Sequence, residues 1–181
     1  MKPEKKYYWE TRELVIIGSF AALIKVISFL VSITGGGMNP ITLIMKNIVA
    51  TSLLIILISS VRKFGVLSLY VVVSGIISML TMGMGMMLLP GLLLAGILCE
   101  LIIKYTGGYK STKAIILGVF FFELSFRVIS LGLGYIFTRE NPQILMMAVF
   151  AVVLGFVGCL IGLKVGSSFS KELKHAGIIK V

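Results

Sequence analysis

Three cationic side chains stand inside otherwise apolar stretches of the sequence: Lys25, Lys46 and Arg127. A charge at the centre of a bilayer costs roughly 3 kcal/mol on insertion scales, and such residues usually face a bundle interior or a wet cavity. With a helical rise of ~1.5 Å per residue, all three fall ~20 Å from the inner membrane surface, in the outer half of the bilayer. This shared depth predicts an outward-facing pocket that binds an anionic group, a carboxylate or a phosphate.

Only one acidic residue is expected at the depth of these cations. Glu123 precedes Arg127 by one helical turn, so the two side chains share a face and can form an ion pair. Lys25 and Lys46 have no evident counter-ion, and Asn47 could add a hydrogen bond beside Lys46. The alternative is that both lysines extend to the outer interface and bind nothing.

The stretches around these charges are typical of an integral membrane protein. The chain has 181 residues, of which 58% are hydrophobic and 13% charged, whereas soluble domains carry about 25% charged residues. The mean hydropathy is +1.08. A net charge of +10 would indicate a nucleic-acid partner in a soluble protein. Here the basic residues lie mostly between apolar stretches, so we expect no nucleic acid and a multi-pass protein of the cell membrane.

Six apolar stretches, most of them near the ~20 residues that span a bilayer, predict an all-α bundle of six transmembrane helices. They form one membrane domain over residues 1–181 and cover about 14–33, 41–61, 66–81, a segment ending near 103, 114–137 and 144–165. The glycines and proline of GGGMNP (35–40) separate the first two. The fourth helix begins either after Pro90 or near Met86.

The basic residues predict that both termini are cytoplasmic. With the N-terminus inside, thirteen Lys and Arg side chains fall on inside segments and only Arg139 on an outside turn. This asymmetry is the positive-inside pattern. Residues 1–12 then form a cytoplasmic N-terminal segment, and 167–181 a basic cytoplasmic tail that is helical at first.

Two glycine-containing loops are candidate gates at the outer surface. The first holds Gly35, Gly36, Gly37 and Met38, and the second is MGMGMM with Met84 and Met86. Glycines offer hinges, and methionine side chains adapt to irregular ligands. A plain hydrophobic loop explains the methionine cluster equally well.

Small residues on the first predicted helix indicate a contact with another helix. Gly18 and Ala22 are four residues apart, a spacing that lets a second helix approach closely. The contact could lie inside the bundle or on a partner protein.

The remaining reactive residue types do not form a catalytic or metal site. The chain has no Asp and no H-E-x-x-H motif, so we expect no enzyme activity, no metal and no cofactor. Glu100 with Lys104 one turn later predicts an interfacial ion pair. Cys99 and Cys159 lie in apolar runs, which is typical of buried free thiols.

Several segments resemble a known family. TRELVIIGSFAALIKVI, VRKFGVLSL, GLLLAGILCELIIKYTGGYKS and KELKHAGI are similar to segments of the Trep_Strep integral membrane family. Six short spans, no nucleotide-binding loop and an outward polar pocket also resemble the substrate-binding S components of energy-coupling factor (ECF) transporters.

The resemblance implies a function. S components capture a micronutrient from outside and deliver it inward together with a transmembrane coupling subunit and two ATPase subunits. It implies that Gly18 and Ala22 contact the coupling subunit, with Gly18 in place of the usual alanine, and that residues 35–38 gate the site. ATP hydrolysis would belong to the partners. The resemblance does not assign the substrate. The predicted site of Lys25, Lys46 and Arg127, with methionine and aromatic walls, would suit a small anionic ligand: an organic acid vitamin, a haem or a siderophore.

Two other functions remain open on the sequence. A stand-alone secondary transporter would use Glu123 as a proton carrier and Arg127 as its switchable partner. A membrane scaffold would use the face of Gly18 and Ala22 and would not need Lys25 or Arg127.

Overall fold

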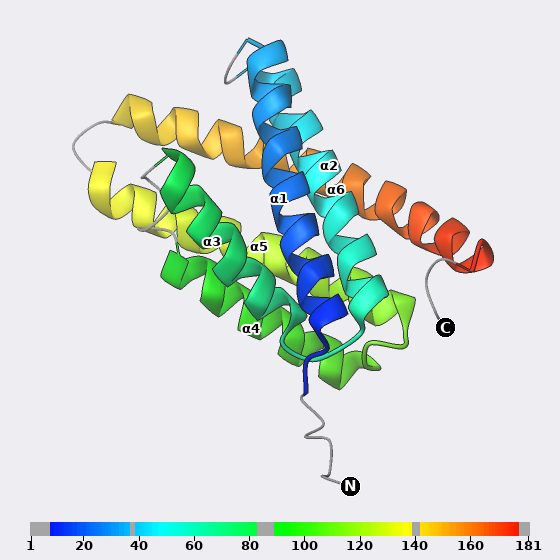
Figure 1. Cartoon of the computed structure of the whole chain (residues 1–181). Coiled ribbons are helices and arrows are strands. Elements are labelled where there is room, and N and C mark those ends of the chain that lie inside the picture. Colours follow the sequence, from blue (N-terminus) through cyan, green and yellow to red (C-terminus); the bar gives the residue numbers. More distant parts are fainter. Residues whose placement is uncertain (1–7, 37–38, 83–88, 139–141, 178–181) are drawn as a thin grey trace, which may run out of the picture.

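The computed structural model describes residues 8–36, 39–82, 89–138 and 142–177, and over these ranges it contains six helices and no strand (Figure 1). The helices are α1 (Thr11–Thr34), α2 (Pro40–Val61), α3 (Val66–Met82), α4 (Leu89–Thr106), α5 (Thr112–Thr138) and α6 (Pro142–His175). Five are long and apolar enough to cross a membrane, whereas the apolar part of α3, Val66–Leu80, is shorter. The all-α prediction is confirmed.

The helix boundaries lie within a few residues of the predicted spans, and α6 extends beyond its predicted span. This helix continues past the predicted span, 144–165, to His175, so the expectation that the tail begins as a helix is confirmed and the two form one element. Lys174 and His175 lie in its last turn, where cations interact favourably with the helix dipole. Gly177 follows with φ of +71°, a left-handed conformation that commonly terminates helices.

Each of the six helices packs against two neighbours in a closed ring, and α2 also contacts two further helices. The ring runs α1–α2–α6–α5–α4–α3 and closes where α3 packs on α1, while α2 also contacts α3 and α5. The contact between α2 and α6 is the most extensive, and α6 crosses α2 obliquely in Figure 1. Residues on α2 can therefore meet side chains from several other helices.

Glycines on α6 allow this close contact. They recur every fourth residue and are Gly158, Gly162 and Gly166. A Cβ on Gly158 would lie 2.5 Å from the carbonyl oxygen of Ile44, and one on Gly162 would lie 2.8 Å from that of Ile48. Ser52 donates a hydrogen bond to the Gly162 carbonyl at 3.1 Å. Small residues at this spacing let helix backbones approach in a membrane. The stripe is visible in the sequence, where its spacing is the same as that of Gly18 and Ala22.

A buried carboxylate from α4 caps the start of α3. Glu100, which is 1% exposed, accepts hydrogen bonds from the backbone N–H groups of Leu67 at 2.8 Å and Ser68 at 3.1 Å. The first N–H groups of a helix have no intrahelical acceptor and carry partial positive charge. The predicted ion pair of Glu100 with Lys104 is wrong, because the carboxylate turns into the bundle while the Lys104 ammonium lies over the Phe64 ring.

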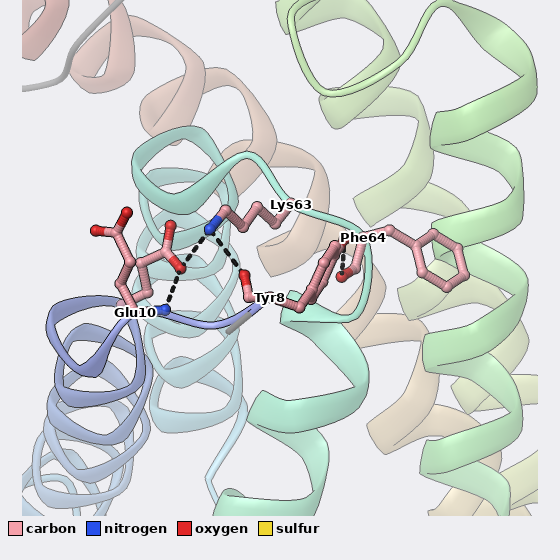
Figure 2. Close-up of polar contacts among 5 residues, drawn as sticks. Tyr8, Glu10, Lys63 and Phe64 are labelled. Carbon is pink, nitrogen blue, oxygen red and sulfur yellow. Dashed lines mark hydrogen bonds and ion pairs between the residues drawn. The ribbon is translucent and has the colours of Figure 1, made fainter. Parts of the chain in front are cut away.

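Polar contacts join the N-terminal segment to the turn between α2 and α3 (Figure 2). The Lys63 ammonium lies 2.7 Å from the Glu13 carboxylate and donates to the Tyr8 carbonyl at 3.0 Å. The Tyr8 hydroxyl donates to the Phe64 carbonyl at 3.2 Å. These contacts place the N-terminal segment and the α2–α3 turn at the same end of the bundle, as the predicted topology requires.

We expect Gly158→Ala to destabilise the protein by ~1–3 kcal/mol, the usual cost of overpacking, because its Cβ would meet the α2 backbone. Gly132→Ala is the matched control, since a Cβ at Gly132 would meet no atom within 4 Å. It should be neutral or stabilising by up to ~1 kcal/mol, because alanine is the better helix former. Unfolding of both variants in detergent, followed by circular dichroism, measures the difference; equal stabilities would contradict the close-contact interpretation.

We expect Glu100→Ala to destabilise the protein by ~1–3 kcal/mol because it leaves buried N–H donors of α3 without an acceptor. Glu172→Ala, at an exposed position of α6, should change stability little. Hydrogen exchange at Leu67 and Ser68 should accelerate in the first variant only. Unchanged exchange at both amides would show that the carboxylate does not cap α3.

Candidate functional site

The Arg127 guanidinium connects three helices in the interior of the bundle. From α5, its Nη2 donates to the Asn47 Oδ1 on α2 at 2.6 Å and to the Glu123 carboxylate at 3.1 Å. Its Nη1 donates to the Val152 carbonyl on α6 at 3.3 Å. The Arg127 and Glu123 side chains are each only 12% exposed. The predicted pairing of these two residues is confirmed, and Asn47 joins them.

The backbone of α6 leaves room for this cluster. A Cβ on Gly155 would lie 2.5 Å from Arg127 Nη1 and 3.1 Å from the Asn47 side-chain nitrogen. That nitrogen donates to the Leu43 carbonyl one turn earlier at 2.7 Å, which turns the amide oxygen toward Arg127. Glycine at 155 is thus the residue that admits a guanidinium between α2 and α6.

One donor of the guanidinium has no protein acceptor in the described part of the chain. Arg127 Nε is buried and makes no hydrogen bond there. An unsatisfied buried donor costs ~1–3 kcal/mol, and arginine presents its N–H groups in a planar fork that fits a carboxylate or phosphate. The cluster therefore retains one donor beyond those that Glu123, Asn47 and the Val152 carbonyl satisfy.

Neither lysine forms a hydrogen bond to the described residues of the Arg127 cluster. Lys25 is half-buried on α1 and donates to the Ser78 hydroxyl on α3 at 2.6 Å. Lys46 is half-buried on α2, and no hydrogen bond or ion pair joins it to another described residue. The structure thus brings Asn47, Glu123 and Arg127 together, places Lys25 between α1 and α3, and leaves the Lys46 ammonium without an acidic partner among the residues described.

The first predicted gate is described in part. Gly35 caps the end of α1, and Gly36 has φ of +70°, which glycine adopts without strain. Gly35 lines a cavity of about 340 Å³ together with Asn39 and Thr42 at the start of α2. The other predicted gate residues lie outside the described residues: Gly37, Met38, Met84 and Met86.

The small residues of α1 face away from the bundle. A Cβ on Gly18 would meet no atom within 4 Å, and Ala22 is exposed while its neighbour Ala21 is fully buried. The spacing of Gly18 and Ala22 therefore does not serve packing among the described helices, and it remains available to a partner.

An apolar groove that the sequence analysis missed runs between the first halves of α2 and α6. Its volume is about 1090 Å³, and Leu43, Met146, Phe150, Val153 and Leu154 are among its lining residues. The signal in the sequence is the run MMAVFAVVL on α6, which is indistinguishable by composition from any other membrane span. No group of three or more metal-ligating side chains occurs in the part of the chain that the structure describes.

Comparison with known protein families gives a match. The model of Trep_Strep, described as a hypothetical bacterial integral membrane protein, matches residues 11–141. The chain belongs to the Trep_Strep family. Together with the membrane-length helices, the match confirms a multi-pass membrane protein. Searches of the curated proteins and of the solved structures found no match.

The matched residues include α1 to α5 of this Trep_Strep protein and stop before α6. Glu123, Arg127 and Asn47 therefore lie in the part that matches the family model, whereas the glycines and the carbonyl that α6 contributes lie beyond it.

We expect Glu123→Gln to destabilise the protein by ~3–5 kcal/mol, because removing one partner of a buried ion pair leaves the other charge uncompensated. Asn47→Ala removes a single acceptor of Arg127 and should cost ~1–3 kcal/mol. Glu172→Gln on the exposed face of α6 is the control for loss of a negative charge. The measurement is the free energy of unfolding in sodium dodecyl sulfate, and a Glu123→Gln value equal to the control would contradict the buried pair.

Proposed function

We propose that this chain is the substrate-binding S component of an ECF-type importer. It would capture a small anionic micronutrient outside the cell and deliver it inward with a coupling subunit and two ATPase subunits. The observation that carries the proposal is the buried Arg127 guanidinium, which retains a free Nε donor inside a helical bundle. Membership of a bacterial integral membrane family is consistent with it.

Glu123 and Asn47 prepare the Arg127 side chain for an anion. Both hold its Nη2, so the guanidinium needs no reorganisation when a carboxylate or phosphate arrives. The Glu123 charge also balances Arg127 while the site has no ligand, and this lowers the cost of burying a cation. Lys25 and Lys46 would supply the net positive charge that attracts the ligand, an effect that strengthens away from water.

The outward face of α1 is suited to packing against a helix of a partner protein. Gly18 and Ala22 expose backbone without large side chains, and helices in membranes associate through such faces. A coupling subunit docked there would supply, through its ATPases, the energy that this chain has no motif to provide. The loops at 35–38 and around Met84 and Met86 would open and close the site. The ligand class would be an acidic vitamin, a haem or a siderophore.

A second function is favoured by the same ion pair. In a stand-alone proton-coupled transporter, protonation of Glu123 would release Arg127 and change the contact between α2, α5 and α6. This hypothesis predicts uptake that follows the proton gradient in cells without any ECF module, whereas an S component requires the coupling subunit.

We expect mass spectrometry and absorbance spectroscopy of the purified protein to detect a released small molecule that Lys25→Ala and Lys46→Ala retain poorly. Loss of one charge-assisted contact should weaken binding about tenfold, so that less of the ligand remains bound through purification. Lys113→Ala, at an exposed position of α5, should retain the ligand. Equal ligand in all folded variants would argue against binding by these lysines.

We also expect Ala22→Leu to abolish co-purification with a coupling subunit, because the larger side chain separates the helices. Gly132→Leu, an equally outward position on α5, is the matched control and should still co-purify. Co-purification of both variants would exclude the α1 face as the docking surface, whereas failure of the wild-type chain itself to co-purify would favour the proton-coupled alternative.

A further inference from the structure

Two half-buried cations, Arg62 and Lys174, lie close together where three helices meet at one end of the bundle. Arg62 directly follows α2, and Lys174 lies in the last turn of α6. The Lys174 ammonium donates a hydrogen bond to the hydroxyl of Thr112, the first residue of α5, at 2.9 Å. The Arg62 guanidinium is near enough to repel that ammonium. We call these three residues the Arg62–Lys174 cluster.

The described part of the protein fixes both cations in place but neutralises neither. Arg62 Nε donates to the Ser59 carbonyl at 3.1 Å, and its two terminal nitrogens make no hydrogen bond to a described residue. Neither cation forms an ion pair with a described acid, and the first turn of α5 is free of acidic residues. Since like charges held together repel, an anion between them would stabilise the cluster.

The backbone at Arg62 gives a second reason to look for a ligand. Arg62 has φ of 44° and ψ of 34°, and it is the single non-glycine residue with a positive φ among those described. Glycine is the usual residue where a helix ends in this left-handed conformation, and strained positions of this kind cluster at functional sites. The helix dipole favours one cation at the end of α2 or α6, but it does not account for two that repel each other.

The cluster lies at the edge of the membrane-spanning part of the molecule. The span of α2 ends at Val61, that of α5 begins at Thr112, and that of α6 ends at His175. About 7.5 Å farther into the membrane along α5 and α6, Leu117 and Phe169 are 39% and 53% exposed. An anion at the cluster would therefore have lipid-facing apolar surface next to it.

We infer that Arg62 and Lys174 bind the phosphate of an anionic phospholipid whose acyl chains lie on the apolar faces of α5 and α6. The planar guanidinium fork fits a phosphate, and basic pockets between transmembrane helices bind anionic head groups. A free phosphate would use the same donors but gain nothing from Leu117 and Phe169. The inference does not depend on the proposed function, because Arg127 lies ~22 Å farther along α5 than Thr112.

The test is native mass spectrometry of the full-length protein in detergent, titrated with dioleoyl phosphatidylglycerol or dioleoyl phosphatidylcholine. The second lipid has the same chains but no net charge. Each Lys or Arg near an anionic head group contributes about fivefold in affinity, so the wild-type protein should bind phosphatidylglycerol about 25-fold more tightly. Glycerol 3-phosphate, which offers the phosphate without the chains, should not displace the lipid at equal concentration.

Arg62→Gly and Lys174→Gln should each reduce the preference for phosphatidylglycerol about fivefold. Glycine adopts a positive φ without strain, so Arg62→Gly removes the cation while keeping the backbone favourable. Lys164→Gln is the matched control, because it removes an exposed lysine from the same helix, ~15 Å from Lys174. It should retain the full preference. Size-exclusion profiles equal to wild type establish that each variant folds.

Three results would overturn the inference. They are equal affinity for the two lipids, the same preference in Lys164→Gln as in the two cluster variants, and displacement of the lipid by glycerol 3-phosphate at equal concentration, which would indicate a free phosphate as the ligand. A partner protein that co-purifies with the wild-type chain, but not with either cluster variant, while the lipid preference is unchanged would show that the cations bind an acidic protein surface instead.

Discussion

The close contact of α2 with α6 is the constraint on which the rest of this structure depends. In a bilayer, apolar side chains gain little by leaving lipid for another helix, so association relies on van der Waals contact and hydrogen bonds over short distances. Gly158 and Gly162 bring the α6 backbone onto α2, and the Ser52 hydroxyl adds a hydrogen bond across the contact. One turn closer to the start of α6, Gly155 leaves the space that the Arg127 guanidinium occupies. The glycines that join the helices therefore also form one side of the candidate site.

The two buried carboxylates in the bundle, Glu100 and Glu123, have different hydrogen-bonding partners. The difference indicates which of them has a structural role and which is a candidate for ligand binding. Glu100 accepts three hydrogen bonds from α3, and its role is complete without any other group. Glu123 pairs with Arg127, and the pair still leaves Arg127 Nε without an acceptor among the described residues. A buried donor in this condition is unfavourable, and it marks the place where a ligand oxygen would stabilise the protein. By this reasoning the Arg127 cluster, and not Glu100, is the better candidate for binding.

The sequence by itself determined the features that depend on short-range patterns. Hydropathy located the helices, the breaker GGGMNP separated the first two, and the spacing of Glu123 and Arg127 predicted their pair, since residues four apart share a helix face. The sequence also predicted that the chain stays helical after the last span, and α6 does continue through polar residues to His175; that the span and the tail form one unbroken helix is seen only in the structure.

Tertiary structure alone decided which helix each polar side chain meets. Lys25 bonds to Ser78, Arg127 to Asn47, and Glu100 to the N-terminus of α3, all between residues far apart in the chain. Those partners depend on the crossing angle and the register of packed helices, and neither quantity is encoded in the periodicity of a single helix. The same reason explains why Gly18 and Ala22 face outward while the glycines of α6 face α2, although both sets have the same spacing.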